Sequence, residues 1–299
     1  MPDALAASVT GFFGPEWARD LPALAARQCD RWGLRPSGAV AHGMVALVVP
    51  VERADGSTAV LKLQPVDDET AGEPIALAAW AGDGAVGLLD HDPATGAMLL
   101  EALSPGRDLS RVEITAALTV IGTLLARLTA CPAPAGLRGL GAVTLDLAER
   151  ADGIVAAGPC SEPDRWLLAD LAARAREIAA EPGDRLLHWD LHYGNVLAPV
   201  PGTGREPWLA IDPKPLAGDP AFDLEPALDN RWDEAVATGD VRRATRFRFD
   251  LLTEVAGLER ERARAWTLVR VLQKCVWAIE GGADRLPAVH AAIAGALSR

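Results

Sequence analysis

The sequence is short of basic residues, and of lysine above all. Its 299 residues include 29 lysines and arginines against 41 aspartates and glutamates, which gives a formal net charge of −12. Only three of those basic residues are lysines. A nucleic-acid-binding protein needs a basic face to meet the phosphates, so this charge balance argues against a nucleic-acid partner. The excess of acid suits a cationic small molecule, or it simply keeps the surface soluble.

Cysteine pairs and long apolar runs are also missing. The four cysteines lie far apart and form no Cys-x-x-Cys pair, so we expect reduced, mostly buried thiols. They are Cys29, Cys131, Cys160 and Cys275. The first residues show no basic stretch followed by an apolar run, which argues against a signal peptide. The most apolar segment, 114–128, contains Arg127 and is too short and too polar to span a bilayer. We therefore predict a cytoplasmic protein without a membrane partner, and we take it to be a monomer.

The stretch with the most chemistry runs from residue 186 to residue 226. It contains the string HWDLHYGN, from His188 to Asn195, and the string IDP around Asp212. Catalytic loops of phosphate-transferring enzymes follow the pattern H-R-D-L-x-x-x-N, in which the aspartate is the base and the asparagine a metal ligand. A second aspartate completes the magnesium site. The spacing therefore predicts Asp190 as the catalytic base, with Asn195 and Asp212 as Mg²⁺ ligands.

Two other interpretations of this stretch compete with phosphoryl transfer. Asp and Asn in a glycine-containing loop often only bond their own backbone in a turn. His188, Asp190 and His192 could also form a zinc or iron site, because imidazole and carboxylate suit both metals. The metal interpretation leaves Asn195 and Asp212 without a role.

A predicted hairpin in the first third of the chain holds the first of the three lysines. Two β-rich runs, 45–51 and 58–63, flank an Asp-Gly turn at 55–56, which is a good hairpin signal. Lys62 lies inside the second run, and burying an unpaired ammonium is costly. A phosphotransferase uses such a lysine to contact the α- and β-phosphates of ATP. The alternative is an edge-strand lysine that extends outward to water.

Lys62 needs a carboxylate partner from the helix that follows, predicted over 70–80. Glu73 lies one turn into that helix and is the expected partner. Glu69 is the alternative, although glutamate at a helix start also suits the helix dipole.

Two further segments are predicted to contact ATP through their backbone. Strands are predicted at 85–90 and 97–101, and a break follows at 104–106. The connector between the lobes is assigned to residues 101–103. The segment 37–47 should cover the phosphates, but it lacks the G-x-G-x-x-G pattern of a glycine-rich loop. The residues assigned to ATP in these segments are His42, Gly43, Met44, Glu101, Ala102 and Leu103.

From residue 108 onward the pattern is mainly helical. Helices are predicted over 111–129, 164–181, 240–256, 260–280 and 285–298, in addition to a leading helix over 21–34. The segment 131–141 is rich in proline and glycine and is predicted to be a loop. The apolar face of 260–280, including Trp266 and Trp277, is expected in the core. We predict an α+β protein of two domains, a nucleotide-binding lobe over 1–101 and a catalytic and substrate-binding lobe over 102–299.

These motifs, in this order, resemble the aminoglycoside phosphotransferase family. The resemblance rests on the strand with Lys62, the helix glutamate, HWDLHYGN and IDP. The longer string IDPKPLAGDPAFDLEPALD is similar to the branch that contains streptomycin 6-phosphotransferases and hydroxyurea phosphotransferases, over roughly residues 21–280. It implies a protein-kinase-like bilobal fold, with an antiparallel sheet plus helix in the first lobe and a mainly helical second lobe.

The same resemblance implies a function. The resemblance implies an ATP- and Mg²⁺-dependent phosphotransferase that acts on an aminoglycoside hydroxyl, the 6-hydroxyl of streptomycin. Phosphorylation at that hydroxyl would confer antibiotic resistance. A kinase for another small molecule such as hydroxyurea, and a nucleotide-binding pseudokinase, are the alternatives. Trp189 replaces the arginine that pairs with an activation-loop phosphate in protein kinases. Pro213-Lys214 replace the Phe-Gly that follows the metal-binding aspartate there, and no Ala-Pro-Glu segment follows, so we expect constitutive activity.

An acidic run follows the catalytic stretch and suggests how a cationic acceptor binds. Guanidinium and ammonium groups need carboxylates, and bidentate pairing favours guanidinium. Some of these residues could instead cap helices, because Asp219 and Asp223 flank Pro220. The residues predicted to contact substrate are Asp190, Asp219, Asp223, Glu225 and Asp229.

Overall fold

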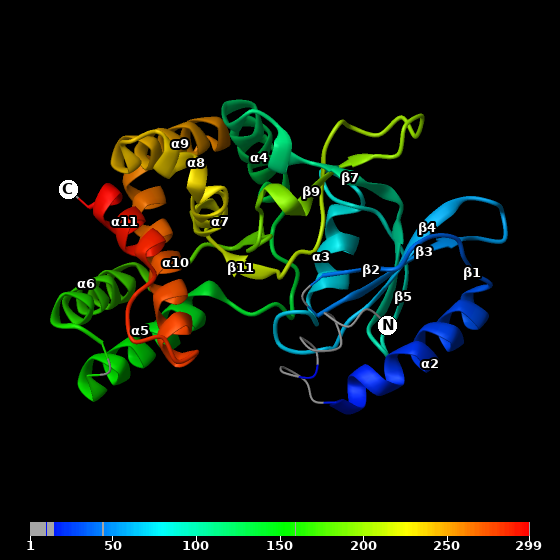
Figure 1. Cartoon of the computed structure of the whole chain (residues 1–299), viewed down its shortest axis with the longest axis horizontal. Coiled ribbons are helices and arrows are strands. Elements are labelled where there is room, and N and C mark those ends of the chain that lie inside the picture. The colour runs from blue at the N-terminus through cyan, green and yellow to red at the C-terminus, as the bar shows by residue number, and fades with distance from the viewer. Residues whose placement is uncertain (1–9, 11–14, 44, 159, 299) are drawn as a thin grey trace. The chain divides into compact units, whose positions relative to one another are not determined.

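The computed structural model describes residues 10, 15–43, 45–158 and 160–298, and Figure 1 shows its helices and strands. Two compact units are present: residues 1–106 with 198–211, and residues 107–197 with 212–299. The boundary predicted from the sequence lies at 101/102. The first unit extends to residue 106 and also takes in 198–211, a segment that returns to it from the middle of the chain.

The first unit is built on a six-stranded antiparallel sheet in the order β1-β3-β4-β6-β5, with β2 paired to β3. The predicted hairpin is confirmed as β3 and β4, and its turn is fixed by Asp55 Oδ1, which accepts the Ser57 amide at 2.9 Å. The strands are β1 (Arg35–Pro36), β2 (Ala41–His42), β3 (Leu47–Glu52), β4 (Thr58–Leu63), β5 (Leu88–Asp92) and β6 (Ala97–Glu101).

Two helices use opposite faces of this sheet. Successive side chains of a strand point to opposite faces. Leu61 of β4 packs in an apolar cluster with Leu21 and Cys29 of α2 (Pro15–Trp32), while Lys62 contacts α3 (Glu73–Trp80). Helix α2 begins six residues before the predicted start, with proline at the first helical position, where its missing N–H is no loss.

The second unit is mainly helical, as predicted, and α10 lies at its centre, packed against α5, α6, α7 and α11. Trp266 is fully buried there, but Trp277 is 36% exposed, so the core prediction is wrong for that residue. The helices are η1 (Leu109–Arg111), α4 (Ile114–Leu128), α5 (Leu140–Ala157), α6 (Glu162–Ile178), α7 (Glu225–Asp229), α8 (Trp232–Ala237), α9 (Val241–Ala256), α10 (Arg260–Glu280) and α11 (Ala288–Leu297).

Helix α5 was not predicted, and its sequence explains why. Its N-cap is Gly139, which gives no side-chain hydrogen bond, and its first turn has no acidic residue. Two glycines lie within it, and each lowers intrinsic helix stability by about 1 kcal/mol relative to alanine. Tertiary packing against α6 and α10 therefore stabilises this helix.

Two short strands frame the catalytic stretch. Strand β8 (Arg185–Leu187) pairs antiparallel with β11 (Leu216–Gly218). A side chain at Gly218 would place its Cβ 2.7 Å from Leu140 Cβ, so only glycine allows this close approach. The pair sets residues 188–195, after β8, beside residues 212–215, before β11. A three-stranded sheet, β10 (Leu209–Ala210), β9 (Val196–Pro199) and β7 (Leu103–Asp108), completes the strands.

The remaining sequence expectations can be checked directly. All four cysteines are free thiols and three of them are buried, as predicted. None of the helices in the described part of the chain is long and apolar enough to cross a membrane. A sheet-based first unit and a mainly helical second unit confirm the α+β prediction with two lobes.

Candidate active site

The backbone of the catalytic stretch is held by a buried carboxylate from η3 (Pro220–Leu224). Asp223 accepts the backbone amides of His188 and Trp189, each at 2.8 Å. Trp189 has φ +65°, a left-handed conformation that is a strong outlier for a bulky residue. Such strain persists only where the surroundings over-determine it. The two bonds to Asp223, with the Lys214 amide donating to His188 O at 3.0 Å, supply that constraint.

The predicted base and the first predicted metal ligand are joined through the backbone. Asn195 Nδ2 donates to Asp190 O at 2.9 Å, and the His192 amide donates to the same oxygen at 3.0 Å. The Asn195 side chain is thereby oriented, and its Oδ1 faces away from this bond as an acceptor. An amide oxygen and a carboxylate are the hard oxygen donors that Mg²⁺ prefers, so Asn195 and Asp212 fit this metal.

The Asp190 carboxylate lies beside a cation. Its Oδ2 is 3.3 Å from Lys214 Nζ. Burial alone would raise the pKa of Asp190, but Lys214, followed by His192, Arg270 and His188, lowers it below the ordinary value. The group is therefore an ionised carboxylate near neutral pH, which can accept a proton from an attacking hydroxyl.

Asp212 is the second strained residue of the stretch, with φ +58°. Among the described residues, four non-glycine residues have positive φ, and two of them are Trp189 and Asp212. Residues in such conformations cluster at active sites, where the geometry is part of the function. Pro213, which follows, has its own φ fixed by its ring. The local geometry thus supports Asp212 as a functional residue.

The alternative metal triplet does not form. His188 Nδ1 accepts the Asp190 amide at 3.3 Å, and His192 Nδ1 accepts the Gly194 amide at 3.1 Å, so both rings serve the backbone of the loop. In the described part of the chain, the single group of His, Cys, Asp and Glu close enough to share a metal is Glu225, Asp229 and His290.

In the first unit, Lys62 and Glu73 form a buried ion pair, as predicted. Lys62 Nζ lies 2.7 Å from Glu73 Oε1 and 2.8 Å from Oε2. Gln64 Nε2 donates to Oε2 as well, at 2.5 Å. Buried ion pairs need such additional hydrogen bonds to offset desolvation. Glu69, the alternative partner, lies in the preceding turn, where its amide donates to Asp67 Oδ1.

The segment assigned to the phosphates forms a hairpin tip between β2 and β3. Gly43 donates its amide to Ala46 O at 3.0 Å, and His42 Nδ1 lies 3.0 Å from Gly43 O. The Gly43 amide is therefore already used within the tip. Met44 lies outside the described residues.

The first residue of the connector segment 101–103 is hydrogen-bonded within the first unit. Glu101 donates its amide to Gly87 O at 2.8 Å, and its Oε2 accepts Arg205 Nη1 at 2.7 Å. Arg205 belongs to the returning segment 198–211, so Glu101 anchors that segment. Ala102, between β6 and β7, and Leu103, the first residue of β7, stay candidates for adenine.

Two residues predicted to bind substrate stabilise the protein. Asp219 caps η3, accepting the Ala221 amide at 2.9 Å, and its other oxygen pairs with Arg262 Nε at 2.5 Å. Asp223 is fully buried by η3 and β8 and holds the catalytic stretch, as described above. Burial raises the pKa of Asp223 to about 7, against the lowering effect of the amides of His188 and Trp189. These contacts give both residues a structural role, and their contact with substrate stays a prediction.

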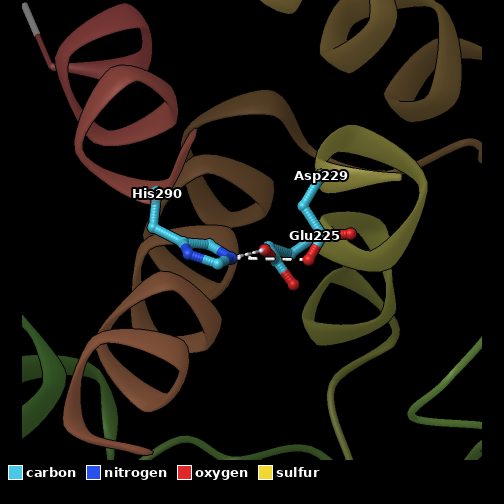
Figure 2. Close-up of side chains that lie close together, drawn as sticks. All are labelled: Glu225, Asp229 and His290. Carbon is cyan, nitrogen blue, oxygen red and sulfur yellow. Dashed lines mark hydrogen bonds and ion pairs between the residues drawn. The ribbon is translucent and has the colours of Figure 1, made fainter. Parts of the chain in front are cut away.

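Glu225 and Asp229 face His290 (Figure 2). His290 Nε2 lies 3.2 Å from Glu225 Oε1 and 3.4 Å from Asp229 Oδ2. Lys274 Nζ is 3.3 Å from Asp229 Oδ2, and Arg270 Nε is 3.8 Å from Glu225 Oε2. Burial lowers the pKa of His290, but Asp229 and Glu225 raise it more.

This group of side chains is best explained as a buried ion-pair network joining α7, α10 and α11. Three residues have ligand atoms within 4.8 Å of one another, as a metal site requires. However, Lys274 and Arg270 already match the charge of the two carboxylates, and His290 Nε2 lies within 3.4 Å of both of them. The side chain of Glu225 is 0% exposed and that of Asp229 13% exposed, so both serve this network, and their contact with substrate stays a prediction.

Two residues beside the catalytic stretch were missed or misplaced by the sequence prediction. Trp277 lies with its ring centroid 6.2 Å from that of Trp189 and is partly exposed. Arg138, from the loop before α5, lies over the Trp189 ring at 5.1 Å. The sequence showed only a Pro/Gly-rich loop there; pairing of its backbone with β8 and β11 brings Arg138 to this place.

Known proteins with similar sequences are kinases of antibiotics and of hydroxyurea. The model of the aminoglycoside/hydroxyurea antibiotic resistance kinase family matches residues 31–282. A streptomycin 6-kinase of Streptomyces glaucescens is 53% identical, covering 99% of this chain and 96% of the relative. A hydroxyurea phosphotransferase of Kitasatospora aureofaciens is 54% identical, covering 96% of this chain and 82% of the relative.

Solved structures confirm the fold. A macrolide 2'-phosphotransferase from Brachybacterium faecium shares 21% identity with a TM-score of 0.58, covering 94% of this chain and 98% of that one. The choline kinase of Streptococcus pneumoniae shares 11% identity with a TM-score of 0.56. Both support the predicted protein-kinase-like architecture. With its family match and its relatives above 50% identity, the chain is a phosphotransferase acting on a hydroxyl group and belongs to the aminoglycoside/hydroxyurea antibiotic resistance kinase family.

Proposed function

We propose that this enzyme transfers the γ-phosphate of ATP to the 6-hydroxyl of streptomycin and thereby confers resistance to it. The observation that carries the proposal is the geometry of Asp190: an ionised carboxylate on a strained, fully bonded loop, with a magnesium-type donor tied to its own backbone. The choice of acceptor is supported by identities of 53% and 50% to two streptomycin 6-kinases, over 96% and 97% of their lengths.

The reaction follows from the residues present. Asp190 accepts the proton of the acceptor hydroxyl while the new oxygen–phosphorus bond forms and the bond to the β-phosphate oxygen breaks. Asn195 and Asp212 would hold Mg²⁺, which neutralises charge on the phosphates when it is bound. Lys62, held by Glu73, binds the α- and β-phosphates.

The acidic character of the whole chain helps to attract a cationic acceptor. A net charge of −12 raises the local concentration of a cation such as streptomycin. Asp190 stays the substrate-contacting carboxylate, and Trp277 offers a partly exposed aromatic face near the ring of Trp189, the residue before it. A cytoplasmic, monomeric state stays a prediction.

Hydroxyurea is the second candidate acceptor. It is favoured by the 54% identity to a hydroxyurea phosphotransferase, although the match covers less of that relative, 82%. The same base and metal ligands would serve a hydroxyurea hydroxyl.

A panel of acceptors tests the proposal. ADP release is measured with ATP, Mg²⁺ and streptomycin, dihydrostreptomycin, kanamycin, hydroxyurea or no acceptor, and phosphorus NMR locates the product phosphate. We expect turnover with the two streptomycins, a phosphomonoester on carbon 6, and none after chelation of the metal. Turnover with hydroxyurea alone would establish the second candidate. Nucleotide binding without acceptor-dependent ADP release would contradict both and indicate a pseudokinase.

A further inference from the structure

All three lysines of the chain pair with a carboxylate, but one pair differs from the others. Lys62 with Glu73 and Lys274 with Asp229 lie mostly inside the protein. Lys214 is 36% exposed, and its partner is the proposed base, Asp190. The pair is only partly shielded from water, and exposed ion pairs contribute little to stability, about 0–1 kcal/mol.

The position of Lys214 is fixed by the same bonds that fix the base. Its amide donates to His188 O at 3.0 Å, and it follows Pro213 and the strained Asp212. Its Nζ lies 3.3 Å from Asp190 Oδ2. A single short segment therefore carries a proposed metal ligand, Asp212, and a cation two residues later that reaches the base.

The chemistry requires a reacting phosphate near this ammonium. An acceptor hydroxyl must lie within about 2.6–3.2 Å of the Asp190 carboxylate to give up its proton. The oxygen of that hydroxyl is the atom that attacks the γ-phosphorus, so the transferring group lies next to the same carboxylate. An ammonium on a flexible stem beside Asp190 is then within reach of the γ-phosphate oxygens.

We propose that Lys214 is a catalytic residue that binds the γ-phosphoryl group during transfer, leaving the Asp190 carboxylate to the acceptor hydroxyl. The inference rests on the proposed phosphotransferase function and assigns it one further residue. In the step, the acceptor oxygen–phosphorus bond forms, the bond to the β-phosphate oxygen breaks with its electrons going to ADP, and the proton passes to Asp190. Lys214 stays protonated and donates N–H bonds to the equatorial oxygens, where charge is spread.

The choice of lysine at this position agrees with that role. The chain has 26 arginines, so arginine is its usual cation. An ammonium is a compact point charge with three rotatable donors, whereas a guanidinium is a planar fork suited to one fixed geometry. A group that moves from a carboxylate to a phosphate benefits from the first kind of charge.

Substitution of Lys214 by methionine separates transition-state binding from a merely structural role. We expect Lys214→Met to lower kcat by about 10²–10³-fold, the usual effect of removing one donor to a developing charge. KM for ATP and for streptomycin should stay close to the wild-type values, and so should the melting temperature. ADP with aluminium fluoride and acceptor mimics the transition state, and the affinity for this complex should fall by about the same factor as kcat falls. The affinity for ADP alone should stay at the wild-type value. Lys214→Arg should recover part of the lost rate.

Lys274→Met is the matched control, a second lysine of the same unit that pairs with a carboxylate at the same 3.3 Å. It should lower the melting temperature and leave kcat of the folded enzyme near wild type. The inference is overturned if Lys214→Met keeps kcat within about 10-fold of wild type, because loss of a donor to the developing charge should lower kcat further. It is also overturned if the affinities for ADP and for its aluminium fluoride complex fall equally. These comparisons require that the wild-type enzyme phosphorylates streptomycin. If the wild type shows no such activity, the result counts against the proposed function and not against the role of Lys214.

Discussion

Two groups of charged side chains in the second unit each join a lysine to a carboxylate but differ in their exposure to solvent. The open pair is Asp190 with Lys214, and the closed cluster is Glu225, Asp229 and His290 with Lys274. Each contains a lysine 3.3 Å from a carboxylate. In the open pair the side chains of Asp190 and Lys214 are 21% and 36% exposed. In the closed cluster the exposed fractions are 0% for Glu225, 10% for His290, 13% for Asp229 and 23% for Lys274.

The difference in access to solvent suits the open pair to catalysis and the closed cluster to stability. In the open pair, water and reactants can replace one partner, so the charges are available to a substrate. In the closed cluster, loss of one partner leaves a buried charge uncompensated, which is strongly destabilising. Asp223 stands between these cases: it is buried, but its two bonds fix the backbone of the catalytic stretch.

The largest effect is expected in the open pair. Asp190→Asn removes the proton acceptor and should lower the single-turnover transfer rate by about 10²–10⁴-fold, the usual contribution of a general base. The melting temperature should be unchanged, because the half-exposed pair adds little stability. A rate near that of the wild type would show that another group accepts the proton.

Asp223→Asn should lower both kcat and the free energy of unfolding. An amide offers one acceptor oxygen, and its NH₂ would face one of the two backbone amides of His188 and Trp189. Displacement of the loop by a small distance should lower kcat by about 10²-fold, and the unpaired buried amide should lower the free energy of unfolding by about 1–3 kcal/mol. Urea unfolding and steady-state rates measure the two effects. Full activity in a destabilised variant would mean that Asp223 supports the fold alone.

The closed cluster should govern stability without governing turnover. His290→Leu leaves Glu225 and Asp229 with less positive charge, and breaking such a buried pair costs about 3–5 kcal/mol. Urea unfolding should show this loss, while the kcat of the folded fraction stays near wild type. A large fall in kcat at unchanged stability would place His290 in the active site.

The closed cluster should also respond to pH in a defined direction. Asp229 and Glu225 raise the pKa of His290 above its ordinary 6.5, so the folded state binds the proton more tightly than the unfolded state. The contribution of His290 is fully present below pH 6.5 and is lost as pH rises through the folded-state pKa. The difference in unfolding free energy between wild type and His290→Leu should therefore shrink as pH rises. A difference that grows with pH would contradict a protonated His290.

The smallest effect is expected at a surface pair outside both groups. Arg150 pairs with Glu280 on the exposed sides of α5 and α10. Glu280→Ala should change the free energy of unfolding by no more than about 1 kcal/mol and leave kcat unchanged. A larger loss would show that exposed pairs, too, contribute to this fold.

Local patterns in the sequence were enough for the catalytic stretch. The spacing of Asp190, Asn195 and Asp212 is a chemical requirement, so it is visible without a structure. The pairing of Lys62 with Glu73 was also predictable, because alternation in β4 and the start of the next helix fix which face each residue occupies.

Roles that depend on burial were not predictable in this way. Asp223 and Glu225 look like any substrate-binding carboxylate, since sequence shows their charge but not what covers them. Packing of η3 and α7 against α10 encloses both. Arg138 reaches Trp189 only because the loop before α5 pairs with β8 and β11, a contact between segments about 50 to 80 residues apart.

The most direct test of this account compares the single-turnover transfer rate of Asp190→Asn and His290→Leu on folded enzyme with saturating ATP and streptomycin. The account predicts a rate lowered by about 10²–10⁴-fold for Asp190→Asn and a rate close to wild type for His290→Leu. Equal losses in both variants, or a loss confined to His290→Leu, would contradict the division between the open pair and the closed cluster.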